Sequence, residues 1–276
     1  TLKNTLILIV VFGSVYSMII SETGFVGWFH SFLFHFQRER LIIYFMSFLL
    51  GVLCNRLGVF ESNEKNMKQY VESDILEEQT PGAILIDRST EFVESKKGLL
   101  FNVDLEKYDF SVGSKSLIRA SEGTILDRIP PRKMVRQDAS IELPHILFLI
   151  DDPQRSIIEP LFEKKDSFEM VYDFDLMKHS GHITGWKISD EDTLSQISDA
   201  FEKVADVTAY ETKYGSKDLL LFAVGDGNHS LATAKTIWEE LKASSGDDTT
   251  IMNHPARFAL VEINNVYDEG LTCEAI

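Results

Sequence analysis

The 276-residue chain has very few cysteines and comparatively few basic residues, and both shortages narrow the kind of protein it can be. Cys54 and Cys273 are its only cysteines, which excludes a disulfide framework and a zinc site built from several thiolates. The 27 lysines and arginines face 43 aspartates and glutamates, for a net charge of -16. A chain this acidic is unsuited to broad electrostatic binding of nucleic acid, so we expect no nucleic-acid partner.

Several well-known catalytic motifs are also missing. The sequence contains no Gly-x-Ser-x-Gly elbow, no His-Glu-x-x-His helix, no Walker loop and no dinucleotide fingerprint. Their absence argues against a serine hydrolase of the common type, a zincin and a P-loop enzyme. The apolar content of 44% excludes a wholly disordered chain, and the length suits one large domain or two smaller ones.

Charge is distributed unevenly along the chain. Residues 1–60 carry four basic and two acidic side chains, whereas the remainder carries 23 basic and 41 acidic ones. Two uncharged runs in residues 1–60 approach the length that a bilayer-spanning helix needs. We therefore expect an apolar helical hairpin that attaches the chain to a membrane through residues 5–21 and 41–60. The alternatives are a buried helical hairpin in a soluble protein and a non-native N-terminus.

Residues 61–276 have the pattern of a soluble α/β domain, which we expect to be cytoplasmic and cut short at its carboxyl end. Apolar periodicity and turn residues predict a mixed sheet with flanking helices. We expect helices over residues 63–78, 192–205 and 231–242. Strands are expected over 83–86, 98–103, 146–150 and 219–224, and a long ordered loop over 111–140.

One strand-to-helix junction carries most of the functional signal. The apolar run 219–224 is typical of a strand covered on both faces, and it ends abruptly at the hexapeptide Gly-Asp-Gly-Asn-His-Ser, residues 225–230. Open α/β sheets bind ligands at such carboxyl ends, and the free N–H groups of the next helix favour an anion. We therefore expect an anionic small molecule to be bound by Gly225, Gly227, Asn228, Ser230 and Thr233.

Asp226 and His229 are the candidate catalytic residues of this junction. A carboxylate would repel a phosphate there, so Asp226 is better suited to a metal such as Mg²⁺, to a proton or to a ligand hydroxyl. His229 can act as acid, base or ligand near neutral pH. The alternative is a tight glycine turn in which Asn228 or Ser230 caps the helix.

Two further groups of residues are candidate parts of a site. Residues 115–136 are rich in arginine, and we expect Arg119, Glu122, Arg128 and Arg132 to complete the anion site if this loop folds over the hexapeptide; the alternative is a solvated loop. Asp173, Asp175 and His182 have a spacing that suits a divalent metal, against the alternative of solvated surface. Asp151 and Asp152 end the strand 146–150, and we expect them at the ligand edge of the sheet.

Several long strings resemble one family of uncharacterised prokaryotic proteins, family 1015 of the domains of unknown function. The strings are SKSLIRASEGTILDRIPPR (114–132), IELPHILFLIDDP (141–153), YDFDLMKHSGHITG (172–185), LLFAVGDGNHSLATAK (220–235) and HPARFALVEINNVYDEG (254–270). The resemblance covers about residues 61–276 and implies a shared site but no reaction. Residues 1–60 do not resemble the family's soluble amino-terminal part.

The Asp-Gly-x-His turn is also similar to a loop of ParB-like and sulfiredoxin-like proteins, some of which bind nucleotides and transfer phosphate. Those proteins usually place an arginine after the histidine, where this chain has Ser230. From the residues we expect a small-molecule enzyme that binds a phosphorylated or nucleotide-like ligand. The alternatives are a non-catalytic ligand-sensing or scaffold module and a metal-dependent hydrolase. The last requires Asp226 or His229 to meet the group around Asp173.

Overall fold

The computed structural model of the protein describes residues 28–30, 35–37, 59–73, 76–143, 145–246 and 249–272. The chain divides into two compact units, Thr1–Asn66 and Met67–Ile276. In the first unit, β1 (Trp28–His30) pairs with β2 (His35–Gln37) in antiparallel fashion. The two candidate membrane segments of the expected apolar helical hairpin, 5–21 and 41–60, fall outside the described residues except for positions 59 and 60. Among the described residues, no helix is both long and apolar enough to cross a bilayer.

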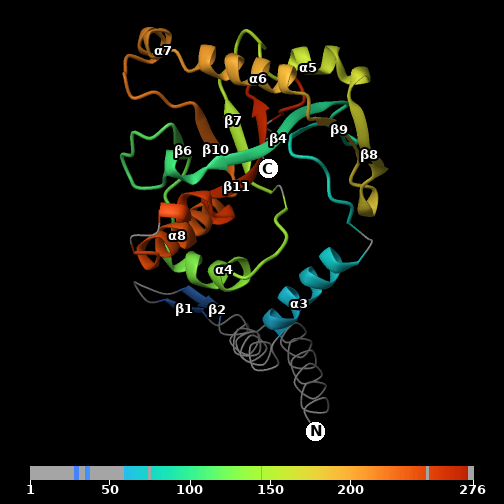
Figure 1. The fold of residues 1–276 in the computed structure, drawn as a ribbon. Helices are drawn as coiled ribbons and strands as arrows, with labels where there is room; N and C mark the ends of the chain where they lie inside the picture. The colour runs from blue at the N-terminus through green and yellow to red at the C-terminus, as the bar shows by residue number, and fades with distance from the viewer. Residues whose placement is uncertain are drawn as a thin grey trace. The chain divides into compact units, whose positions relative to one another are not determined.

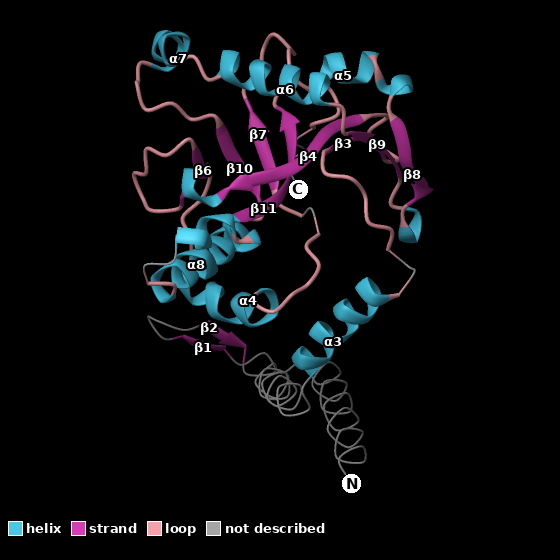
Figure 2. Ribbon diagram, viewed as in Figure 1, coloured by secondary structure: helices cyan, strands magenta, loops and turns pink. Residues whose placement is uncertain are grey.

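The second unit is built on a mixed nine-stranded sheet with flanking helices, so the expected α/β class is confirmed there. The order of its strands is β5-β6-β10-β7-β11-β4-β3-β9-β8 (Figures 1 and 2). The strands are β3 (Ala83–Ser89), β4 (Lys96–Asp104), β5 (Tyr108–Asp109), β6 (Ile118–Ala120), β7 (Leu147–Ile150), β8 (Glu169–Asp175), β9 (His182–Ile188), β10 (Phe222–Asp226) and β11 (Phe258–Asn265). The helices are α3 (Val59–Glu72), α4 (Ile129–Arg136), α5 (Glu159–Glu163), α6 (Glu191–Val204), α7 (Val207–Tyr214) and α8 (Asn228–Ser244).

Strand direction changes at the centre of the sheet. β6 and β10 are parallel, as are β7 and β11, but β10 and β7 are antiparallel. The carboxyl ends of these two parallel pairs therefore lie at opposite ends of the sheet. Figure 1 shows α8 after the end of β10, whereas α5, α6 and α7 gather at the other end.

The core is apolar and rich in aromatic rings. Phe201 of α6 packs edge-on against Phe101 of β4 and Phe222 of β10, with ring centroids 5.6 Å apart in both pairs. The ring centroid of Phe148 on β7 also lies 5.6 Å from that of Phe222. α6 begins at Asp190, whose carboxylate accepts the N–H of Thr193 as a helix cap. This packing of α6 holds the central strands in place.

Most of the expected elements are present, with shifted ends. The helix expected over 192–205 is α6, and the strand expected over 146–150 is β7. α8 begins at Asn228, three residues earlier than expected, and β10 extends to Asp226. The long loop expected over 111–140 is wrong in part, because β6 and α4 lie within it. A three-residue strand and a helix opened by two prolines give too little periodicity to be found in the sequence.

Candidate active site at the end of strand β10

The hexapeptide 225–230 forms the turn between β10 and α8, where the sequence placed it. Gly227 has a φ of 81°, and a Cβ atom there would lie 3.0 Å from the Cα of Ile146. A Cβ atom on Gly225 would lie 2.9 Å from the side chain of Leu149, at a break in the pairing of β10 with β7. The close approach of β7 therefore requires both glycines.

Asn228 joins the turn to the preceding loop. Its buried amide donates to the Val224 carbonyl at 3.3 Å and the Ser121 hydroxyl at 3.2 Å, and accepts the Ser121 N–H at 3.2 Å. The Ser121 hydroxyl also donates to the Val224 carbonyl. The loop after β6 thus folds over the hexapeptide, which was the condition for an arginine contribution to the site, and Asn228 holds the loop there.

His229 is also built into this contact. It is only 8% exposed, and its Nε2 accepts the N–H of Ile125 at 3.1 Å. A ring nitrogen that accepts an N–H carries no proton, so neutral His229 is protonated at Nδ1, which lies 3.7 Å from Oε1 of Glu122. Residue 229 therefore secures the loop 121–125 to α8.

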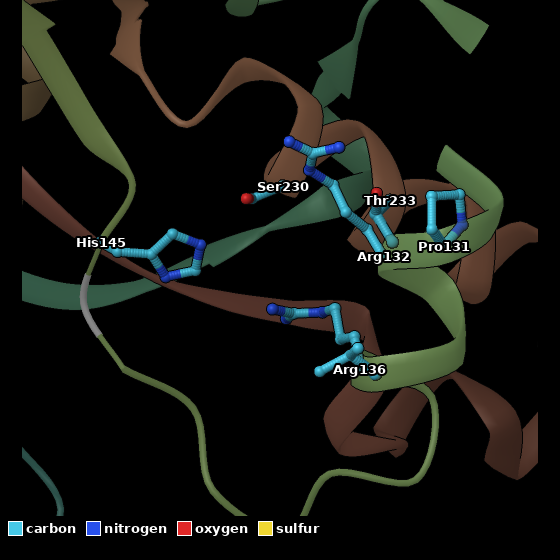
Figure 3. A pocket seen from close by; sticks show the side chains of 7 residues that line it. Pro131, Arg132, Arg136, His145, Ser230 and Thr233 are labelled. Atoms are coloured by element: carbon cyan, nitrogen blue, oxygen red, sulfur yellow. The ribbon is translucent and has the colours of Figure 1, made fainter. Parts of the chain in front are cut away.

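A cavity of about 330 Å³ opens between α4 and α8 beside this turn. Its polar lining consists of Arg132 and Arg136 from α4, Ser230 and Thr233 from α8, and His145 just before β7. Figure 3 shows His145, Ser230 and both guanidinium groups around the same space. Two cationic side chains therefore face the amino-terminal end of α8, as an anion site requires.

A second cavity of about 200 Å³ lies next to the first and shares His145 with it. Asp226 lines this second cavity, together with Arg88, Lys96 and Glu262. Glu262 is buried, and its carboxylate pairs with Arg88 at 3.0 Å and Lys96 at 3.5 Å. We call the two cavities together the His145 cleft: an arginine-lined half at α4 and a carboxylate-containing half at β11.

The tautomer of His145 follows from the one hydrogen bond that its ring makes among the described residues. Nδ1 lies 2.9 Å from the carbonyl oxygen of Leu143, which can only accept, so Nδ1 of the neutral ring carries the proton. Nε2 then has a free lone pair. His145 is therefore an oriented base at the boundary of the two cavities.

The start of α8 adds positive potential to the cleft. Leu231 is the first residue whose N–H bonds back into the helix, to the Gly227 carbonyl at 2.9 Å. The N–H groups of the preceding turn lack such partners, and the helix dipole adds its positive end there. The N-cap residue is Gly227, which has no side chain with which to cap these N–H groups. These N–H groups are the donors on which the expectation of a bound anion depends.

The comparison with known families supports the resemblance seen in the sequence. Residues 54–276 match the family described as "Protein of unknown function (DUF1015)". The chain belongs to this family. The match begins a few residues before the boundary of 61 expected from the sequence. No curated protein and no solved structure matches the chain.

Other residues expected at the site of this DUF1015 chain lie elsewhere or do not line the cleft. Arg119 on β6 points away, since its guanidinium donates to the carbonyl of Asp218 at 2.8 Å. Arg128 is exposed and contributes its main-chain carbonyl to Arg132 at 3.0 Å. Glu122 faces His229 rather than either cavity. Of the expected arginines, the structure brings only Arg132 to the cleft.

The expected metal ligands do come together, but on strands far from the hexapeptide. His182 contacts Asp175 at 2.7 Å through Nδ1 and Asp173 at 2.5 Å through Nε2. Both ring nitrogens are thus engaged by carboxylates, and no group of three or more ligating side chains suited to a metal ion occurs among the described residues.

The sheet order separates this cluster from the hexapeptide. β8 and β9 form one edge, and β10 lies six strands from β8, about 29 Å at about 4.8 Å per strand. Asp173 and His182 therefore cannot share a site with Asp226 or His229. The metal-dependent hydrolase that required such a meeting is incompatible with this fold.

The direction of β7 explains why the sequence did not reveal all of the residues that line the cleft. Because β7 is antiparallel to β10, its first residues lie beside the hexapeptide, and Asp151 and Asp152 lie at the opposite end of the sheet. The expectation that these aspartates share the ligand edge is wrong. His145 and Arg136 hold the places in the cleft that the sequence assigned to other residues. A local pattern does not reveal strand direction, so only the arginine-rich character of 115–136 pointed to Arg136.

Proposed function

We propose that this protein is an enzyme that binds a phosphorylated or nucleotide-like small molecule in the His145 cleft and performs proton-transfer chemistry on it. One observation carries the proposal. His145 lines both cavities, with Arg132 and Arg136 on one side and Asp226 on the other. Anion binding and acid–base groups therefore meet at a single histidine.

The arginine-lined half suits the anionic group of the ligand. The Arg132 guanidinium has one hydrogen bond within the described residues, to the Arg128 carbonyl, so further N–H donors remain for phosphate oxygens. Arg136 pairs with Glu142 at 2.6 Å, which orients its guanidinium and partly neutralises it. Arg132 is thus the principal anion-binding side chain, assisted by the Ser230 hydroxyl and the end of α8.

The other half suits the part of the ligand that reacts. Nε2 of His145 takes a proton from a ligand hydroxyl or a water molecule, and the Leu143 carbonyl stabilises the resulting imidazolium through Nδ1–H. Asp226 accepts its neighbouring Gly227 N–H at 2.6 Å, which fixes the carboxylate at the cavity wall. The Asp226 carboxylate can accept a hydrogen bond from a second ligand hydroxyl or hold a Mg²⁺ ion that accompanies the phosphate.

A second candidate function is non-catalytic ligand sensing. The engagement of His229 with Ile125 favours it, because this histidine serves the fold and lies outside the lining of both cavities. Both functions share the anionic ligand, so they differ only in whether the bound molecule is changed.

Calorimetric titration with a panel of nucleotides and sugar phosphates, with and without Mg²⁺, tests the ligand. Arg132→Ala is expected to weaken the binding of a hit about tenfold or more, as loss of a charged hydrogen bond predicts. The matched control is Arg128→Ala, which removes the same charge from an exposed position four residues earlier. Equal weakening by both variants, or no hit at all, would contradict the proposal.

Phosphorus NMR of the bound hit over time then separates the two functions. An enzyme converts the ligand in the wild type and loses conversion, but not binding, in His145→Gln. Binding without conversion in the wild type would favour sensing.

A further inference from the structure

The reversal of strand direction gives the sheet a second ligand-type edge. β7 and β11 are parallel, and both end on the side away from the hexapeptide. Ligands of α/β sheets occupy crevices beyond the carboxyl ends of parallel strands, near the point where the strand order reverses. A cavity of about 440 Å³ lies at this edge, larger than either half of the His145 cleft.

The walls of this cavity are apolar and aromatic. Val204 at the end of α6 and the segment Leu219–Leu221 before β10 form one wall. Tyr210 and Tyr214 of α7 form another, with ring centroids 4.7 Å apart and planes inclined by 43°. Such a volume is typical of small-molecule sites, and paired aromatic rings favour flat ligands.

The charges in the cavity balance one another. Asp151 receives the Lys213 ammonium at 2.6 Å and the Tyr214 hydroxyl at 2.5 Å. Burial alone would raise the pKa of Asp151, but these hydrogen bonds bring it below its usual value, so the carboxylate stays ionised. Asp152 is buried and accepts the N–H groups of Ser156 and Ile157. With Lys203 as the second cation of the lining, no excess positive charge remains for a phosphate.

We propose that this cavity, the α7 cavity, binds an uncharged planar heteroaromatic molecule of nucleoside size. The ring lies against Tyr210 and the apolar wall, and the exposed amide of Gln154 pairs with its polar edge. A primary amide offers a donor and an acceptor side by side, which matches the edge of an adenine ring.

The structure also indicates how a ligand enters. α7 has no buried residue, and Lys213 and Tyr214 fasten its last turn to Asp151. Helices with so few buried contacts open at a small fraction of the global unfolding free energy.

The α7 cavity shares no lining residue with the His145 cleft, so this inference stands apart from the function proposed above.

Adenosine, which has the planar ring and no phosphate, is the test probe. Calorimetry or protein NMR should show saturable binding to the wild type. Tyr210→Ala removes the stacking ring and is expected to weaken binding about tenfold. Ala209→Trp fills the cavity from an exposed position without deleting a contact, and is expected to abolish binding.

Two controls locate the effect. Tyr70→Ala removes an exposed tyrosine from α3, and Arg132→Ala alters the His145 cleft; both should leave adenosine affinity within twofold. The proposal is overturned by absent saturation, or by binding that Tyr210→Ala and Ala209→Trp do not change. Binding lost only in Arg132→Ala would place the nucleoside in the His145 cleft and overturn the α7 site alone.

Discussion

At the scale of single residues, His229 and His145 have different roles: one is buried in the fold and the other faces the cleft. The sequence pointed to His229 because it follows a glycine turn, whereas His145 precedes a strand without any motif around it. In the structure, His229 is buried and hydrogen-bonded to Ile125, and His145 is exposed with Nε2 free in the cleft. Nε2 of His229 already accepts the Ile125 N–H, so this nitrogen is not available to a ligand.

This difference predicts opposite effects of two alanine substitutions. His229→Ala leaves the Ile125 N–H without its acceptor and should lower the free energy of unfolding by about 1–3 kcal/mol. His145→Ala should change it by less than about 0.5 kcal/mol, as is usual for an exposed side chain. Urea unfolding followed by circular dichroism measures both. Equal stabilities of the two variants would show that His229 does not secure the loop.

The cluster on β8 and β9 gives a residue-scale prediction about pH. The carboxylates of Asp175 and then Asp173 accept hydrogen bonds from the imidazole of His182 and raise its pKa above 6.5. Because the folded-state pKa is raised, the cluster stabilises the fold fully below pH 6.5 and loses this effect as the pH rises through the raised value. NMR titration should show the raised pKa in the wild type and a value near 6.5 in the double variant Asp173→Asn, Asp175→Asn. A pKa that the substitutions leave in place would mean that the carboxylates do not hold the imidazolium.

At the scale of elements, the long periodic segments were predictable and the short ones were not. α6 was found because its apolar residues repeat at helical spacing, and β7 and β10 because short apolar runs end at turn residues. β6 and α4 were missed, and α4 carries both arginines of the arginine-lined half of the cleft. The turn between β10 and α8 was placed correctly because the two glycines mark it, although the contact of β7 with them was not foreseeable.

The turn itself predicts an element-scale effect. Gly227→Ala combines a left-handed backbone with a Cβ atom 3.0 Å from Ile146, and should destabilise the protein by about 2–4 kcal/mol. Gly215→Ala is the matched control, since Gly215 ends α7 with a φ of 70° and has no atom within 4 Å of an added Cβ. It should cost only the backbone strain, about 1–2 kcal/mol. Thermal unfolding measures both, and equal losses would show that the approach of β7 does not constrain the turn.

At the scale of the whole molecule, the order and direction of the strands determine which residues meet. β10 lies between β6, more than a hundred residues earlier in the chain, and the antiparallel β7. These are non-local pairings that no window of the sequence contains. The same topology brings His145 to the hexapeptide, places Asp151 by α7 and puts His182 five strands from β10.

The two apolar runs near the start of the sequence lead to a prediction for the whole chain. The apolar runs at 5–21 and 41–60 should bind a membrane, because their transfer from water into lipid is favourable. The full chain should sediment with membranes on cell fractionation, whereas a chain that begins at Met67, where the second unit starts, should stay in the supernatant. Recovery of both in the same fraction would mean that residues 1–66 are not the anchor.

If the ligand contacts His145 and not His229, nitrogen NMR of the two imidazole rings should distinguish them. With ¹⁵N-labelled histidine, a phosphorylated hit from the titration panel is added to the wild-type protein. We expect the Nε2 resonance of His145 to move in a saturable manner while both ring nitrogen resonances of His229 stay in place. A moving His229 with an unchanged His145 would contradict this expectation.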